Sequence, residues 1–203
     1  MKACKTIINP KKSSHCRSCG LYINQFPLSD NKKQADIFWV GLSAVQIDDN
    51  DEQKIPLSPS TKSGKLIHDV ELASNMNISF FKTNLVKCLP LNEKKIRYPE
   101  RVEMNKCYPN LEIEIDTYKP KIVFLLGRLV AEFTLKKYGL KLGGLGSDFS
   151  YKEYKVGETT FVPVHHPSYM LVYKRKHIDK YIAGIQEVIS SNLLCEVGLD
   201  RAI

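Results

Sequence analysis

Four cysteines stand in two groups whose side chains suit a metal centre. Cys16 and Cys19 form a CxxC pair, Cys88 ends an apolar run, and Cys107 falls inside a helical pattern. Four thiolates are the usual ligands of a structural zinc ion or of an iron–sulfur cluster. The ligand types alone suit both. Four protein ligands leave no open position on the metal, so the centre is predicted to be structural rather than catalytic.

The cysteine usage also bears on the compartment. The chain starts Met-Lys-Ala-Cys-Lys, without the apolar segment of an export signal, and no apolar run approaches the roughly 20 residues of a membrane span. We therefore expect a cytoplasmic protein that does not contact a membrane, in which cysteines bind metal rather than form disulfides. Cys4 and Cys195 are expected to stay outside the centre, with Cys4 as a reserve ligand.

The charge balance favours a polyanionic partner. Lysine and arginine number 30 against 22 acids, a net charge of +8. Neutralising nucleic-acid phosphates releases counterions, which gives a basic surface its affinity. Two basic runs, residues 94–98 and 173–177, are candidates for that contact, although each is equally consistent with a solvated loop or helix start. A nucleic acid is a partner of this kind, and the protein is expected to act as a monomer.

Apolar runs alternate with helical patterns along the chain. Strands are predicted over residues 37–41, 80–86 and 122–126, and a hairpin from 151–154 and 160–164. Helices are predicted over 66–72, 100–118, 128–138 and 178–194. This alternation predicts an α/β protein, a three-layer α/β/α sandwich around a mostly parallel central sheet. We expect residues 1–203 to form a single domain, with 1–35 as an N-terminal arm and cluster loop.

Four residues fall where predicted strands end. Gly41, Asn84, Gly127 and His166 all lie at or near the carboxyl ends of these strands. Ligands of open parallel sheets bind at that edge, so the four residues are expected to share one site.

Ordered motifs around these residues resemble one known family. The segments Thr83–Pro90 and Cys107–Leu111 are similar to the cluster-bearing half of the family 4 uracil-DNA glycosylases. The agreement spans about residues 16 to 190 and includes, in the same order, Val40-Gly41, Pro56-Leu57, Leu125-Leu126-Gly127 and His166-Pro167-Ser168. The resemblance implies a uracil-DNA glycosylase-like fold, removal of a base from DNA, and a [4Fe-4S] cluster on Cys16, Cys19, Cys88 and Cys107, with structural zinc as the alternative.

The resemblance also implies roles for two site residues. His166, which directly precedes proline as the family histidine does, would donate a hydrogen bond to O2 of the departing base. Asn84 would bind the Watson–Crick edge of the flipped base. Its amide has an acceptor and two donors, so one orientation suits uracil and the other suits cytosine. Asn84 therefore predicts pyrimidine recognition without separating the two bases.

A loop after His166 is the predicted DNA contact. Residues of this loop would enter the duplex in place of the flipped base, and basic side chains follow it. For Met170 and Leu171 a place in the core is the alternative. The predicted DNA-binding residues are Ser168, Tyr169, Met170, Leu171, Lys174 and Arg175.

The pocket motifs depart from the family pattern. Where the family has Gly-Glu-Ala-Pro-Gly, this chain has Gly41-Leu42-Ser43-Ala44-Val45, which makes Ser43 a candidate base contact. Leu57 replaces the phenylalanine that stacks on the base, a contact worth about 1–3 kcal/mol. Asp48 or Asp49 would take the place of the acid that positions water, although both acids are also typical of a solvated loop.

These departures shape the functional hypotheses. The first is excision of a pyrimidine from DNA, with a modified or bulky base, as in defence against phages with modified DNA, favoured over uracil because of Leu57. Ordinary uracil repair is the alternative within that class. A DNA-binding relative without catalysis is the second hypothesis, and a zinc-bound nucleotide hydrolase or scaffold is the third.

Overall fold

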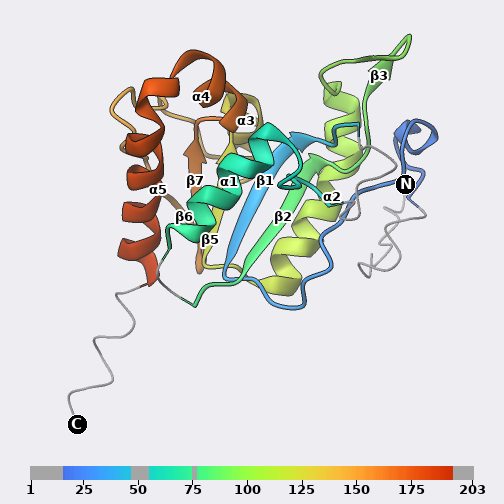
Figure 1. Ribbon diagram of the computed structural model, residues 1–203. Helices are drawn as coiled ribbons and strands as arrows, with labels where there is room; N and C mark the ends of the chain where they lie inside the picture. Colours follow the sequence, from blue (N-terminus) through green and yellow to red (C-terminus); the bar gives the residue numbers. More distant parts are fainter. Residues whose placement is uncertain (1–15, 47–54, 75–76, 194–203) are drawn as a thin grey trace.

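The computed structural model describes residues 16–46, 55–74 and 77–193 (Figure 1). Its centre is a five-stranded sheet in the order β2-β1-β5-β7-β6, parallel except for β6. The strands are β1 Ile37–Ser43, β2 Phe80–Val86, β5 Ile122–Leu126, β6 Tyr154–Val156 and β7 Thr159–Val164. The predicted mostly parallel sheet is confirmed.

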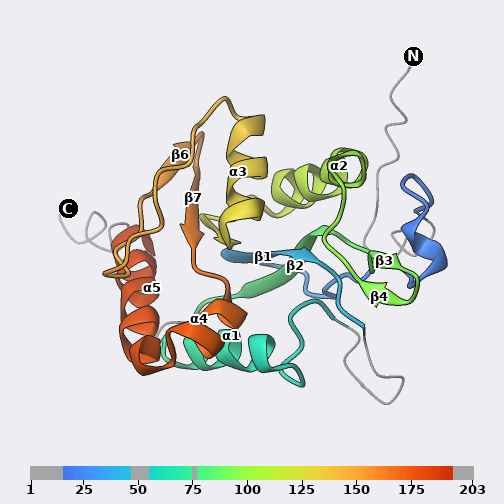
Figure 2. The ribbon, with the colours of Figure 1, turned by 90° about the horizontal axis from the view of Figure 1, so that it is seen from above.

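Helices cover both faces of the sheet (Figure 2). On one face lie α2 (Arg101–Tyr118) and α3 (Arg128–Lys137), and on the other α1 (Lys62–Leu72), α4 (Pro167–Tyr173) and α5 (Ile178–Leu193). Alternate strand residues serve the two faces: Phe38 packs in the α2–α3 core and Trp39 in the α1–α4–α5 core. The three-layer α/β/α sandwich is therefore confirmed. Within the part of the chain described here, no helix is long and apolar enough to cross a membrane.

The amino-terminal segment protects the free edge of β2. The Leu28 backbone N–H donates to the carbonyl of Lys87 at 2.9 Å, and the Lys82 N–H donates to the Asp30 carboxylate at 3.0 Å. These bonds occupy backbone groups that an uncovered edge strand would offer to another chain. A short 3-10 turn, η2 (Leu21–Ile23), precedes this segment and lies close to the CxxC pair.

Helix α1 begins earlier than the sequence pattern predicted. Thr61 caps it by accepting from the Gly64 N–H at 3.0 Å, so the helix starts at Lys62 rather than near Leu66. A Cβ atom at Gly64 would collide with the carbonyl oxygens of Leu57 and Ser58. Glycine at this position therefore lets the helix lie directly on the turn that contains Leu57.

Two elements correct the sequence prediction. The segment after His166, predicted as a loop, is helix α4, because His166 caps it and Pro167 takes its first position. The second is a hairpin of β3 (Leu91–Asn92) and β4 (Lys95–Ile96), which the sequence did not indicate. The predicted hairpin at 151–164 does form, but β6 starts only at Tyr154. A 3-10 turn, η3 (Arg175–His177), links α4 to α5.

Candidate active site and cysteine pocket

The predicted site residues meet at one edge of the sheet. Because β1, β2, β5 and β7 are parallel, their carboxyl ends share an edge, and Gly41, Asn84, Gly127 and His166 lie at or near these ends. Side chains alternate along a strand, so Asn84 projects from the same face as Lys82, whose ammonium pairs with Glu71 of α1 at 2.9 Å. Helix α4, which His166 caps, lies on this face too.

A glycine makes room for the Asn84 amide. Asn84 is paired in register with Gly41 of β1, and its side chain is 4% exposed. A Cβ atom at position 41 would collide with Oδ1 of Asn84. Glycine at position 41 therefore leaves room for the amide beside the neighbouring strand, and a side chain there would force the amide to move.

His166 is held in one tautomer by the start of α4. Its Nδ1 accepts from the Ser168 backbone N–H at 3.1 Å and lies 2.8 Å from the Ser168 hydroxyl. A backbone N–H can only donate, so Nδ1 is the acceptor and the proton of the neutral ring is on Nε2. Burial lowers the pKa of His166 from its usual 6.5, which keeps the ring neutral at pH 7. The site thus contains a neutral imidazole with an N–H for donation.

A second glycine lies beneath this histidine. Gly127 follows β5 with φ of +92°, a conformation that favours glycine, and a Cβ there would lie 3.3 Å from Cβ of His166. The neighbouring His165 has different partners: its Nδ1 lies 3.3 Å from the Tyr151 hydroxyl, and its ring stacks on Tyr169 with centroids 5.5 Å apart. The two adjacent histidines therefore have separate environments.

The predicted DNA-contact residues on helix α4 differ in their exposure to solvent. Ser168 and Tyr169 are exposed, Leu171 is half-buried, and Met170 is fully buried in the α1–α4–α5 core. Met170 thus occupies the core position that the sequence left as its alternative. Beyond the helix, Lys174 is half-buried and Arg175 is exposed.

Two further exposed side chains lie on the same helix: Val172, which was missed from the sequence, and Tyr173, which was considered only as the start of a basic run. Val172 is 69% exposed and Tyr173 is 74% exposed, and the ring centroids of Tyr169 and Tyr173 lie 5.5 Å apart. Their spacing of three and four residues from Tyr169 is the signal that would have placed all three on one face, had the segment been recognised as a helix.

The remaining pocket predictions lie in the connection between β1 and α1. Ser43 is half-buried at the end of β1. Leu57 has φ of +51°, unusual for a residue with a Cβ, and its side chain packs against the α1–α4–α5 core. Asp48 and Asp49 lie outside the described residues.

All four predicted cysteine ligands line one pocket. Cys16 and Cys19 come from the amino-terminal loop, Cys88 follows β2, and Cys107 belongs to α2. Burial, with the nearby sulfurs of the other three cysteines, raises the pKa of Cys88 to about 12. The Cys88 thiol therefore becomes a thiolate readily only beside a positively charged centre. Cys4 and Cys195 lie outside the described residues.

The two candidate centres, zinc and an iron–sulfur cluster, differ in how closely their ligands must approach one another. Among the described residues, no group of three or more His, Cys, Asp or Glu side chains converges closely enough to hold one metal ion. A zinc site requires every sulfur within about 2.3 Å of the same ion. An iron–sulfur cluster instead offers a separate iron to each thiolate, so its ligands stand farther apart.

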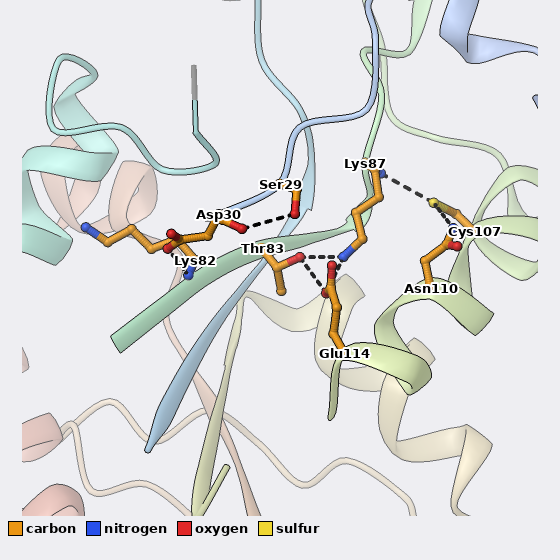
Figure 3. Close-up of polar contacts among 8 residues, drawn as sticks. All are labelled: Ser29, Asp30, Lys82, Thr83, Lys87, Cys107, Asn110 and Glu114. Carbon is orange, nitrogen blue, oxygen red and sulfur yellow. Dashed lines mark hydrogen bonds and ion pairs between the residues drawn. The ribbon is translucent and has the colours of Figure 1, made fainter. Parts of the chain in front are cut away.

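Polar groups around Cys107 join β2 to α2 (Figure 3). The Lys87 backbone N–H and the Asn110 amide both donate to Cys107 Sγ, at 3.4 and 3.6 Å. The Lys87 ammonium also bonds the Thr83 hydroxyl and pairs with Glu114 at 2.6 Å, with only 4% of its side chain exposed. Thr83 in turn donates to Glu114 at 2.8 Å, which closes the network.

A family model matches most of the chain. The model described as the uracil DNA glycosylase superfamily matches residues 28–188. This range contains all the strands, together with Asn84, His166, Cys88 and Cys107.

Similar curated proteins share one description. A type-4 uracil-DNA glycosylase of Sulfurisphaera tokodaii is 29% identical over 184 residues, covering 85% of this chain and 80% of the relative. The corresponding proteins of Saccharolobus solfataricus and Archaeoglobus fulgidus are 28% and 26% identical, over 87% and 85% of this chain and 82% and 86% of their own lengths.

A solved structure is similar in fold. The crystal structure of wild-type Pedobacter heparinus SMUG2 superposes with a TM-score of 0.57 and 15% sequence identity, covering 80% of this chain and 78% of the other. At this identity the likeness concerns the fold, which agrees with the three-layer arrangement described above.

Proposed function

Because this chain belongs to the uracil DNA glycosylase superfamily, we propose that it is a DNA glycosylase that hydrolyses the N-glycosidic bond of a flipped pyrimidine and leaves an abasic site. The observation that carries the proposal is the placement of Asn84 and His166. Both lie on the same face and edge of the sheet, and each rests against a glycine that fixes its direction.

The spacing of the two side chains suits a single base between them. Three strand spacings, about 14 Å, separate β2 from β7 in the sheet. The flipped base would occupy this interval, between the amide of Asn84 and the imidazole of His166. The base would direct its Watson–Crick edge to Asn84 and its O2 to His166.

His166 would stabilise the charge that develops as the bond breaks. Negative charge accumulates on O2 of the departing base, while the sugar becomes cationic. A neutral Nε2–H, fixed by the Ser168 N–H on the other ring nitrogen, is a preorganised donor for that oxygen. The ring need not gain or lose a proton in this step.

A water molecule must then attack the sugar. We assign its positioning to Asp48 or Asp49, by the resemblance of the preceding strand end to the family motif. Ser43 and Leu57 would line the base pocket from the same connection. The face of α4 that carries Ser168 and Tyr169 would contact the DNA strand, together with Lys174 and Arg175.

A [4Fe-4S] cluster held by Cys16, Cys19, Cys88 and Cys107 is part of this proposal. The pocket that the four cysteines share supports a metal centre, and the resemblance to the family 4 enzymes favours a cluster over zinc. Such a cluster would hold the amino-terminal loop, the end of β2 and α2 together, while base release depends on residues elsewhere. Protein purified without oxygen should contain about four irons. One zinc per chain would contradict the cluster while leaving the fold unchanged.

A modified or bulky pyrimidine is the proposed substrate, in a role such as defence against phages with modified DNA. Leu57 supports it, since leucine stacks less on a base than phenylalanine does and leaves more room. Uracil is the second candidate, favoured by the names of the type-4 relatives. A monomeric, cytoplasmic enzyme acting on DNA completes the proposal.

The direct test compares DNAs of different base content. Wild-type protein and His166→Ala are incubated with matched duplexes containing uracil, cytosine or an enlarged cytosine, and released bases are identified by mass spectrometry. We expect His166→Ala to release the base on the order of 100- to 1000-fold more slowly than the wild type, because a preorganised hydrogen-bond donor is lost. Binding without base release by the wild type would support the inactive DNA-binding alternative.

A further inference from the structure

The short hairpin after Cys88 projects from the body of the protein (Figure 1). It consists of β3 and β4, paired through Leu91 with Ile96 and Asn92 with Lys95. Glu93, Lys94 and Lys95 are exposed at its tip, and Ile96 and Tyr98 are 56% and 77% exposed. A hairpin with this much apolar surface in solvent is typical of a contact surface.

The base of the hairpin is firmly held. Arg97 forms two hydrogen bonds with the Glu103 carboxylate, at 2.8 and 2.6 Å, and its Nε donates to the Leu91 carbonyl at 3.2 Å. Glu103 also accepts from the Glu100 N–H at 2.7 Å at the start of α2. The bonds from Arg97 lower the pKa of Glu103, so the carboxylate stays charged. Arg97 thus fixes the base of the hairpin to the start of α2, whereas Lys94 and Lys95 are exposed at its tip.

The tip itself adopts an unfavourable backbone conformation. Glu93 and Lys94 have φ of +47° and +68°, as the two central residues of a tight hairpin turn. Such turns favour Asn-Gly, and other residues with positive φ cost of order 1–3 kcal/mol each. Strain of this kind accumulates at functional sites, and here it holds the exposed Lys94 in the turn of the hairpin.

The hairpin stands beside the proposed active site. It leaves the carboxyl end of β2, the strand that carries Asn84, and its base is bonded to the start of α2. In the view from above the hairpin lies beyond the β2 edge of the sheet, while helix α4 lies toward β7 (Figure 2). A duplex presented to Asn84 and His166 would therefore extend between the two projections.

We propose that the hairpin of residues 91–98 is a second DNA-binding element, in which Lys94 and Lys95 contact phosphates of the strand beyond the flipped nucleotide. The proposal rests on the proposed function, because it places DNA at the edge that carries Asn84 and His166. Helix α4 would contact the DNA near the extruded base, and the hairpin would orient the duplex on the protein. The cysteine pocket, whose ligands Cys88 and Cys107 flank this segment in sequence, would fix the hairpin relative to the sheet.

The test measures DNA affinity against salt concentration. Fluorescence anisotropy follows binding of a short labelled duplex with one uracil, and of the same duplex without it, to wild type and Lys94→Ala/Lys95→Ala. Each lost phosphate contact lowers the slope of log affinity against log salt by about one. For the double variant we expect the slope to be smaller in magnitude by about two. Its affinity for the duplex should be about tenfold lower than that of the wild type at physiological salt.

A matched control removes the same charge elsewhere. Lys32 and Lys33 are also adjacent and exposed, but they precede β1 and so lie at the opposite edge of the sheet. Lys32→Ala/Lys33→Ala should keep the wild-type slope and an affinity within about twofold, since screening limits distant charges. Glu93→Lys adds a cation to the tip and should raise the slope by about one.

The outcomes separate this proposal from the proposed function. Equal losses in the two lysine pairs would show a general effect of charge and overturn the hairpin as a specific element. Unchanged binding in Lys94→Ala/Lys95→Ala would overturn it as well. If the wild type binds DNA through the hairpin but releases no base from any duplex, glycosylase activity is refuted and the DNA-binding element stands.

Discussion

The polar side chains on the two faces of β2 have opposite surroundings. On the α2 side, Thr83 and Lys87 are locked to Glu114 and next to the cysteine pocket, so each polar atom is committed to a partner. On the α1 side, Asn84 rests against a glycine that leaves space around its amide. The first arrangement stabilises the fold, and the second leaves hydrogen-bonding capacity for a ligand. Through the alternation of its side chains, one strand thus serves the fold on one face and presents a recognition group on the other.

Disrupting the network of Thr83, Lys87 and Glu114 should have the largest effect, a loss of stability. Glu114→Ala leaves the Lys87 ammonium buried without its carboxylate, and loss of one partner from a buried pair costs about 3–5 kcal/mol of unfolding free energy. Urea unfolding measures this change. Glu112→Ala, two residues away on the same helix but exposed, is the control and should change stability by less than about 0.5 kcal/mol. Similar losses in both variants would refute the stabilising role of the network.

Displacing the Asn84 amide should slow base release and leave the stability of the fold nearly unchanged. Gly41→Ala would displace the Asn84 amide, and a misplacement of about 1 Å can slow an enzyme roughly 100-fold. Single-turnover base release measures the effect. Gly144→Ala is the matched control, because a Cβ at that exposed glycine meets no atom within 4 Å. A normal rate in Gly41→Ala would separate Asn84 from the reaction.

Leu57→Phe sharpens the comparison by altering the proposed base pocket. The larger ring should improve any uracil excision by stacking and impair excision of a bulky pyrimidine by occupying its space. We expect the ratio of the two rates to shift on the order of 10- to 200-fold. The two substrates are measured in competition in one mixture. Efficient uracil excision by the wild type, with an unchanged ratio in the variant, would identify a pocket made for uracil.

The smallest predicted effect is the pH dependence that His166 imposes. Burial lowers its pKa below 6.5 in the folded protein, so the unfolded chain binds more protons as pH falls below that value. Stability contributed by the neutral ring is therefore present above pH 6.5 and lost below it, at no more than about 1.4 kcal/mol per pH unit. His166→Asn keeps a capping side chain without a titrating ring. Its melting temperature should fall less than that of the wild type between pH 7 and pH 5.

The sequence predicted best what depends on burial alone. The run 122–126 was predicted with the bounds of β5, because a strand covered on both faces is continuously apolar, and residues 80–86 were predicted with the bounds of β2. The shared edge of Asn84 and His166 followed from the same parallel sheet. These features need no knowledge of distant partners.

Features that depend on particular contacts were missed. Helix α4 is short and starts from a histidine cap, a residue that is not among the usual capping types. The β3–β4 hairpin turns through Glu93 and Lys94 instead of Asn-Gly, so its turn carries no sequence signal. The partnership of Lys87 with Glu114 joins residues 27 positions apart, and no local pattern indicates it.

The double use of β2 also limits how this protein can change its substrate in evolution. Every residue of the strand is buried, one face serving the α2 core and the other the α1 side. A substitution there that alters recognition also disturbs the fold. The connection between β1 and α1 is less constrained: Ser43 and Leu57 are only half-buried, and Leu57 is the position that departs from the family's phenylalanine. New base preferences should therefore arise in that connection, while β2 is inherited nearly unaltered.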